Sequence, residues 1–282
     1  MKAPIFQINR GVDLHTHTFA SDGVWSPRSL VEAAVAKKIG ILSVCDHETL
    51  SSLKMVGIYA KKNGIQFIPG VEIAIEHKGS VYHLLMYGFD PENAEINALL
   101  EETRLKHWHK KQIMRERLEM RGYKIAESPL DAITESISPI YELACSLEND
   151  ELNFNQAWAI CREVEPKYKI AQPAKKVLDI ARNAGAITIL AHPGRGGAEI
   201  AYASNRIILE LVKLGLEGVE AYYHAHDTSE EERLVELATR HKLLVTCGSD
   251  SHDTKRKPIA WNPALCNQFL ERLNIKPFSA AA

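Results

Sequence analysis

Short apolar runs of strand length recur along this 282-residue chain, and helical patterns lie between several of them. The runs occupy residues 12–14, 39–45, 65–68, 71–75, 81–87, 186–191, 216–222 and 243–247. Helices are expected over residues 27–38, 50–63, 173–184 and 229–242. This alternation favours an α/β fold with a mainly parallel sheet. Because no dinucleotide or phosphate-loop glycine motif is present, it favours a closed or nearly closed barrel over an open nucleotide-binding sheet.

The middle of the chain has a different pattern, with no convincing strand between about residues 97 and 170. Helical patterns run through residues 96–121, 130–147 and 154–163. We therefore expect a helical insertion at 97–170 between two parts of one α/β domain, at 1–96 and 171–282. Residues 104–124 carry eight Lys or Arg against two Glu, whereas residues 125–153 carry seven Asp or Glu and no Lys or Arg. The basic segment could follow a nucleic-acid backbone or pair with the acidic one, and the sequence leaves both open.

Composition excludes several classes of protein. Hydrophobic residues make up 45% and charged residues 25%, which is typical of a globular protein and not of a disordered or fibrous one. The formal net charge of −2 excludes a globally basic nucleic-acid-binding surface. No apolar run approaches the roughly 20 residues of a membrane helix, and the first residues lack a signal-peptide core. The five cysteines form no CxxC pair, so we expect a cytoplasmic protein without a disulfide framework.

The first candidate metal ligands stand in the segment DLHTHTFASDG. His15 and His17 are two residues apart at the end of a short strand, so both imidazoles point to the same face. Asp22 follows on the loop, and Asp13 could orient a histidine ring from behind. A strand end with solvated polar residues is an equally good interpretation of this motif alone.

Further His, Asp and Glu residues end or interrupt the other strand-like runs. They are His47, Glu72, His83, His192, His224, His226, Asp250 and His252. Each has a structural alternative, such as an ion pair for Glu72 or a hydrogen-bonded core role for His83. Together they favour a metal centre, because the carboxyl ends of parallel barrel strands converge on one mouth. Imidazoles with carboxylates suit Zn, Mn or Fe, and the number of ligands is too large for one ion.

The order of these motifs resembles that of the polymerase-and-histidinol-phosphatase (PHP) superfamily. The segments that carry the resemblance are DLHTHTFASDG, DHETL, GVE, an isolated strand histidine, AHPGR and GSDSH, within residues 1–95 and 171–255. The chain is most similar to the stand-alone bacterial branch that includes the 3′,5′-nucleotide bisphosphatase and the RNA 5′-end exonuclease. The resemblance implies a distorted (β/α)7 barrel with a helical insertion and a metal cluster at its mouth.

The same resemblance implies two or three divalent transition-metal ions (Mn, Fe or Zn) and their ligands. His15, His17, Glu72 and Asp250 match the ligands of the first ion. Glu72 would bridge to a second ion held by His83 and His192, while Asp22, His47 and His252 match the third. His226 matches a pocket histidine near the metals, and Arg195 matches a phosphate-contacting arginine. The chain departs from the family pattern at Glu48, where Asp is usual, and at Ser251, where an aromatic residue is common.

The expected activity is metal-dependent hydrolysis of phosphate esters of nucleotides or short RNA ends, with attack by a hydroxide that bridges two ions. The expected partner is a phosphorylated small molecule, a nucleotide or a short RNA 5′ end, with no membrane or protein partner implied. Three alternatives remain open from the sequence. They are a small-metabolite phosphatase of the histidinol-phosphate type, a non-catalytic metal-binding module, and an amide hydrolase on a similar barrel.

Overall fold

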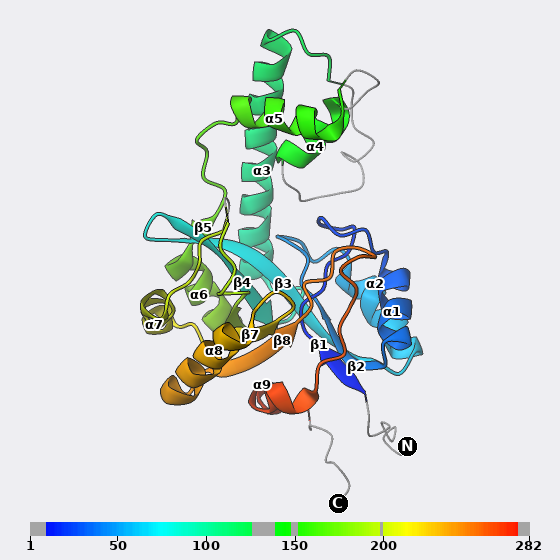
Figure 1. Ribbon diagram of the computed structural model, residues 1–282, viewed down its shortest axis with the longest axis vertical. Coiled ribbons are helices and arrows are strands. Elements are labelled where there is room, and N and C mark those ends of the chain that lie inside the picture. Colours follow the sequence, from blue (N-terminus) through cyan, green and yellow to red (C-terminus); the bar gives the residue numbers. More distant parts are fainter. Residues whose placement is uncertain (1–9, 126–138, 148–151, 198–199, 276–282) are drawn as a thin grey trace, which may run out of the picture.

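The computed structural model describes residues 10–125, 139–147, 152–197 and 200–275, and it has the expected α/β fold (Figure 1). The sheet has the order β1-β2-β3-β4-β6-β7-β8. Its strands are β1 (Gly11–Asp13), β2 (Ile39–Val44), β3 (Gln66–His77), β4 (Ser80–Tyr87), β6 (Ile187–Leu190), β7 (Gly218–Tyr223) and β8 (Leu244–Gly248). A two-residue strand, β5 (Gln172–Pro173), pairs with β3.

Most strand pairs are parallel, but β4 runs antiparallel to both β3 and β6. The two ends of the sheet approach each other beyond β1 and β8. The Leu14 amide donates to the Cys247 carbonyl at 3.1 Å, and Thr16 forms a parallel bridge with Ser251. These contacts bring the first and last strands together, as the predicted distorted barrel requires.

Helices cover the outside of the barrel. Figure 1 shows α1 (Pro27–Ala36) and α2 (Leu53–Lys62) on one side, and α6 (Ala174–Asn183), α7 (Asn205–Leu214) and α8 (Thr228–His241) on the other. A 3-10 turn, η2 (Pro263–Cys266), and α9 (Asn267–Arg272) follow β8. The predicted start of α1 is confirmed: the Ser26 hydroxyl accepts from the Ser29 amide, and Pro27 occupies the first turn. The helix α7 was not among the expected helices, although Arg206, Glu210 and Lys213 of its run NRIILELVKL are spaced along one polar face.

The runs expected at residues 65–68 and 71–75 form one strand, and the prediction of two was wrong. Residues 66–69 of β3 pair with β2, and residues 70–77 pair with β4, so Pro69 falls where the strand changes partner. Gly70 permits this crossing, because a Cβ there would lie 2.6 Å from Ser43 Oγ and 2.7 Å from Cys45 Sγ. A proline and a glycine therefore mark a change of partner here and not a break in the strand.

The middle region is helical, with α3 (Ala94–Met120), α4 (Pro139–Leu147) and α5 (Phe154–Val164). No strand occurs between residues 97 and 170 in the part that the structure describes, and residues 130–138 of one expected helix lie outside it. Ile96 and Leu99, at the start of α3, belong to the main core of the barrel. Met114 and Leu118, near its end, pack with α4 and α5 in a separate small core. One helix thus connects the two regions, while the domain limits at 96/97 and 170/171 stay a prediction.

Candidate metal centre

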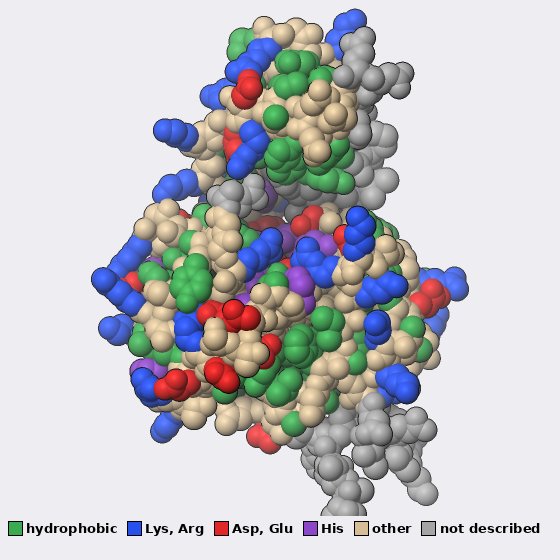
Figure 2. Space-filling view, viewed as in Figure 1, with side chains coloured by type: hydrophobic (Ala, Val, Ile, Leu, Met, Phe, Trp, Pro, Cys, Tyr) green, Lys and Arg blue, Asp and Glu red, His purple; other side chains and the backbone are tan. Residues whose placement is uncertain are grey.

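The strand ends bring histidine, aspartate and glutamate side chains to one place. Figure 2 shows histidines gathered in a hollow between the barrel and the helical insertion, with Lys and Arg side chains beside them. Among the residues that the structure describes, three groups of side chains have possible ligand atoms within 4.8 Å of one another. They are His15, His17, Glu72 and Asp250; His17, Asp22, His47 and His252; and His47, Glu72 and His83. His192 lies outside these groups, but its Nε2 atom is 3.0 Å from Glu72 Oε1.

Glu72 occupies the centre of the cluster and is fully buried on β3. Its two carboxylate oxygens face different imidazoles. The Oε2 atom lies 3.1 Å from His15 Nε2, 3.2 Å from His17 Nε2 and 3.4 Å from His47 Nδ1. The Oε1 atom lies 2.9 Å from His83 Nδ1 and 3.0 Å from His192 Nε2. One carboxylate therefore joins two sets of imidazole nitrogens.

The electrostatics of the cluster fit a bound cation. Burial opposes the charge of His15 and His17, yet the neighbouring carboxylates raise both pKa values, that of His17 to about 10. Although burial opposes their ionisation too, the imidazoles hold the pKa values of Glu72 and Asp250 well below their usual range. These buried anions need positive charge close by. A transition-metal ion can supply this charge in place of the imidazole protons, since each deprotonated imidazole then offers a lone pair, so the donor set fits one.

Asp46 holds the loop that carries Asp22. Its carboxylate accepts from the Thr18 amide at 2.6 Å, the Thr18 hydroxyl at 2.8 Å and the Ser21 hydroxyl at 2.8 Å. Asp22 Oδ1 consequently lies 3.2 Å from His252 Nε2. Asp46 directly precedes His47 in the sequence, but no role was predicted for it.

Glu220 orients His15, and sequence reasoning missed it. Its Oε1 atom lies 3.0 Å from His15 Nδ1, and its Oε2 atom accepts from the His192 amide at 2.8 Å. The contact depends on Gly248, since a Cβ there would lie 2.4 Å from Glu220 Oε1. A signal existed, because Glu220 interrupts an apolar strand just as Glu72 does. The role of ring acceptor was predicted instead for Asp13, whose carboxylate accepts backbone N–H groups of Ser249 and Ile259, each at 2.9 Å.

Arg195 and His226 lie on the loops after β6 and β7. Arg195 is about half exposed, and its Nη1 atom is 3.5 Å from Asp250 Oδ2. The His226 Nε2 atom accepts from the Gly194 amide at 3.1 Å, while its Nδ1 atom donates to the Ala221 carbonyl at 2.9 Å. With both ring nitrogens bonded to backbone, His226 is arranged to hold the loop that carries Arg195.

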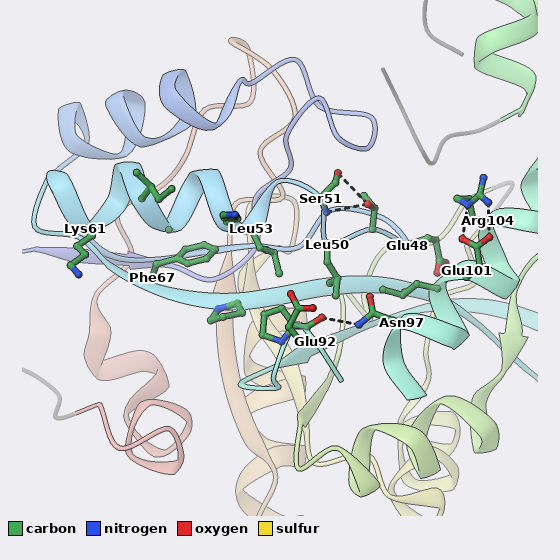
Figure 3. Close-up of a pocket in the computed structure, with 17 residues that line it drawn as sticks. Glu48, Leu50, Ser51, Leu53, Lys61, Phe67, Glu92, Asn97, Glu101 and Arg104 are labelled. Carbon is green, nitrogen blue, oxygen red and sulfur yellow. Dashed lines mark hydrogen bonds and ion pairs between the residues drawn. The ribbon is translucent and has the colours of Figure 1, made fainter. Parts of the chain in front are cut away.

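Glu48, where the family usually has Asp, lies between the cluster and a groove of about 850 Å³ beside α2 and α3. Figure 3 shows Glu48 near Glu101 and Arg104 at one end of the groove and Phe67 at the other. Its Oε1 atom accepts from the Ala74 amide at 2.7 Å, and burial raises the pKa of its carboxyl to about 8. Glu48 therefore lines this groove and accepts a backbone N–H from β3.

Comparison with known proteins gives a consistent result. Residues 13–183 match the family described as the PHP domain. The chain is 28% identical over 246 residues to a 5′-3′ exoribonuclease of Haemophilus influenzae, with 85% of this chain and 89% of the relative covered. It is 25% identical to a 3′,5′-nucleoside bisphosphate phosphatase of Chromobacterium violaceum, with 86% and 87% covered.

A solved structure agrees with these relatives in fold. A protein from Bifidobacterium adolescentis, assigned as a metal-dependent phosphoesterase, superimposes with a TM-score of 0.75 and 26% identity. The superposition covers 93% of this chain and 96% of the other. No helix in the described ranges is both long and apolar enough to cross a membrane. The chain therefore belongs to the PHP domain family of metal-dependent phosphoesterases.

Proposed function

We propose that this phosphoesterase acts on nucleotides or on short RNA 5′ ends, with two or three Mn, Fe or Zn ions at the barrel mouth. The arrangement of imidazoles around Glu72 supports the proposed number of ions. Its Oε2 atom faces His15, His17 and His47, whereas its Oε1 atom faces His83 and His192. A carboxylate with ligands gathered at each oxygen is suited to bridge two ions.

The proposed ligand assignment follows these contacts. One ion would be held by His15, His17, Glu72 and Asp250, and a second by Glu72, His83 and His192. A third would be held by Asp22, His47 and His252. His47 also lies within reach of the second site, since its Nδ1 atom is 3.4 Å from Glu72 Oε2. When bound, such ions lower the pKa of water and stabilise negative charge on a phosphate in hydrolysis.

The residues around the ions would orient the ligands and the substrate. Glu220 fixes the His15 ring, so that its Nε2 atom faces the cluster. Arg195 presents a guanidinium at the mouth, where its paired N–H groups can hold a phosphate. His226 fixes the backbone at Gly194, one residue before Arg195, and so limits the positions that the guanidinium can reach.

The proposal is tested by metal analysis together with assays for released phosphate and for released mononucleotides, because cleavage at an RNA 5′ end liberates a nucleotide and not phosphate. Chelated protein is titrated with Mn and supplied with 5′-mononucleotides, nucleoside bisphosphates, 5′-phosphorylated oligoribonucleotides and histidinol phosphate. We expect two or three ions per chain and turnover on the nucleotide substrates. His83→Ala should lose one ion, whereas His241→Ala, an exposed histidine at the end of α8, should lose none. At most one ion in the wild-type protein, or release from histidinol phosphate alone, would contradict the proposal.

A second candidate is phosphatase action on a small phosphorylated metabolite. It is favoured by the ion pairs that Lys110 forms with Glu165 and Lys111 with Glu142 inside the insertion. Cations paired in this way contribute less to binding of a long RNA backbone. The substrate panel above separates the two candidates.

A further inference from the structure

The carboxylate of Asp250 meets two different sets of partners. Its Oδ1 atom faces imidazoles, at 3.1 Å from His17 Nε2, 3.4 Å from His252 Nδ1 and 3.5 Å from His15 Nε2. Its Oδ2 atom faces Arg256 Nη1 at 2.7 Å, the Tyr223 hydroxyl at 3.1 Å and Arg195 Nη1 at 3.5 Å. Two guanidinium groups from loops far apart in sequence therefore meet at one oxygen on the rim of the metal cluster.

The Arg256 guanidinium is not needed to shape its own loop. The turn is held by backbone groups, since Asp253 Oδ1 accepts from the amides of Lys255 and Arg256 at 2.7 and 2.8 Å. The Ser251 hydroxyl also donates to the Arg256 carbonyl at 2.5 Å. The Arg256 side chain is one-third exposed, and within the described part of the chain its guanidinium hydrogen-bonds to Asp250. It is therefore free to exchange this partner for a ligand without unfolding the turn.

The guanidinium groups of Arg195 and Arg256 both influence the same residue, His224. The ring of His224 lies beside that of Tyr223, with centroids 4.3 Å apart, and partial burial and the charges of Arg256 and Arg195 lower its pKa. Two cations that meet at one oxygen repel each other, and in the described part of the chain both form their ion pair with Asp250 Oδ2. Anionic oxygens placed between the two forks would relieve the repulsion and accept paired N–H bonds from each.

We propose that Arg256 is a second phosphate-binding residue, which forms with Arg195 a two-arginine clamp that selects phosphate monoesters over diesters. A monoester has three non-bridging oxygens and a charge near −2 at neutral pH. A diester has two such oxygens and one charge, so it offers less to two guanidiniums and the adjacent ions at once. The inference rests on the proposed function and favours nucleotides over RNA 5′ ends as its substrates, because a nucleotide phosphate is a monoester whereas trimming of an RNA end cleaves a diester.

The test compares p-nitrophenyl phosphate with bis-p-nitrophenyl phosphate as substrates of the metal-loaded enzyme. Arg256→Gln should lower kcat/KM for the monoester by about 10- to 100-fold, the range for one hydrogen bond to a charged group. The loss should fall mainly on KM, and the diester should lose less than about threefold. Arg256→Lys keeps the charge without the fork and should recover part of the loss. Lys255→Gln, an exposed cation on the same turn, should behave as wild type. Equal losses on both esters, or no loss, would overturn the proposal.

A binding measurement separates this inference from the proposed function. Calorimetry with inorganic phosphate and metal-loaded protein should show about tenfold weaker binding for Arg256→Gln than for wild type, with equal metal content. If the wild-type enzyme hydrolyses none of the nucleotide and RNA substrates of the panel above, the proposed function fails, while this comparison still decides the role of Arg256. Unchanged phosphate affinity in Arg256→Gln and Arg256→Lys would reject the clamp.

Discussion

The barrel mouth and the helical insertion both bring acidic and basic side chains together, but they pair them differently. In the insertion, Lys110 pairs with Glu165, and Arg121 Nη1 lies 2.9 Å from Glu163 Oε2. At the mouth, the buried Glu72 faces five imidazoles and no ammonium or guanidinium group in the described ranges. An imidazole can lose its proton and ligate a metal, whereas lysine and arginine stay charged and only neutralise. The partner of a buried carboxylate therefore indicates whether a cluster is a metal site or a structural ion pair.

The same comparison bears on the basic segment at residues 104–124. The sequence left open whether it binds nucleic acid or pairs within the insertion. Besides its pair with Glu119, Arg115 lies 3.4 Å from the Ile125 carbonyl, and Arg117 donates to the Val164 carbonyl at 2.9 Å. These contacts, with those of Lys110 and Lys111, favour internal pairing. Binding of nucleic acid by the insertion stays a prediction to be tested.

The largest effect is expected from removing one carboxylate charge at the mouth. Glu72→Gln places an amide N–H₂ against imidazole nitrogens that need an anion, so metal content should fall and turnover should drop by at least about 1,000-fold. Elemental analysis and initial rates check the result, with circular dichroism to confirm folding. The matched control is Glu165→Gln, which removes the same charge from the insertion and should keep turnover per folded molecule. Full metal content and turnover in Glu72→Gln would remove the contrast between the two regions.

A smaller effect is expected from changing Glu220, which is not a proposed metal ligand but orients the proposed ligand His15. Glu220→Gln keeps the shape of the side chain but loses one acceptor, since the two oxygens of Glu220 serve His15 Nδ1 and the His192 amide. Metal affinity, measured by competition with a chelator, should fall about 10- to 100-fold. The control is Glu217→Gln, in which the wild-type Oε2 atom accepts from the Thr188 amide of β6 at 3.2 Å. If both variants bind metal equally well, Glu220 supports the barrel and does not position His15.

Much of the fold followed from local patterns in the sequence. Strand-length apolar runs, the Ser26 cap and the helical middle are properties of short segments, and these predictions were confirmed. The single strand β3 was not predictable, because Pro69 and Gly70 break a local pattern while strand pairing on both sides continues. The helix α7 was missed although its run shows the 3.6-residue period, with Arg206, Glu210 and Lys213 at i, i+4 and i+7.

The residues of the site also fall into those that local sequence patterns could identify and those that they could not. Residues at strand ends could be identified as candidate ligands, because parallel strands bring their carboxyl ends together. Glu220 and Arg256 could not be assigned roles, since their partners are set by packing across the barrel. Glu220 is 205 residues from His15 in sequence. Asp13 was given the orienting role for its position on the strand, whereas the structure directs its carboxylate to the loop amides of Ser249 and Ile259.

The smallest effect is expected from breaking an ion pair of the insertion. Lys110 and Glu165 are mostly buried, so Lys110→Gln should lower stability by about 1 kcal/mol, visible as a lower thermal midpoint. Lys124→Gln removes the same charge from an exposed position and should change the midpoint little. If the insertion's cations serve the insertion itself, both variants should retain equal turnover on a mononucleotide and on an oligonucleotide, with an unchanged salt dependence. A larger loss of Lys110→Gln on the oligonucleotide, with a flatter salt dependence, would instead show that this cation contacts a nucleic-acid backbone. In that case the insertion would bind substrate as the barrel mouth does, and its charges would not serve internal pairing alone.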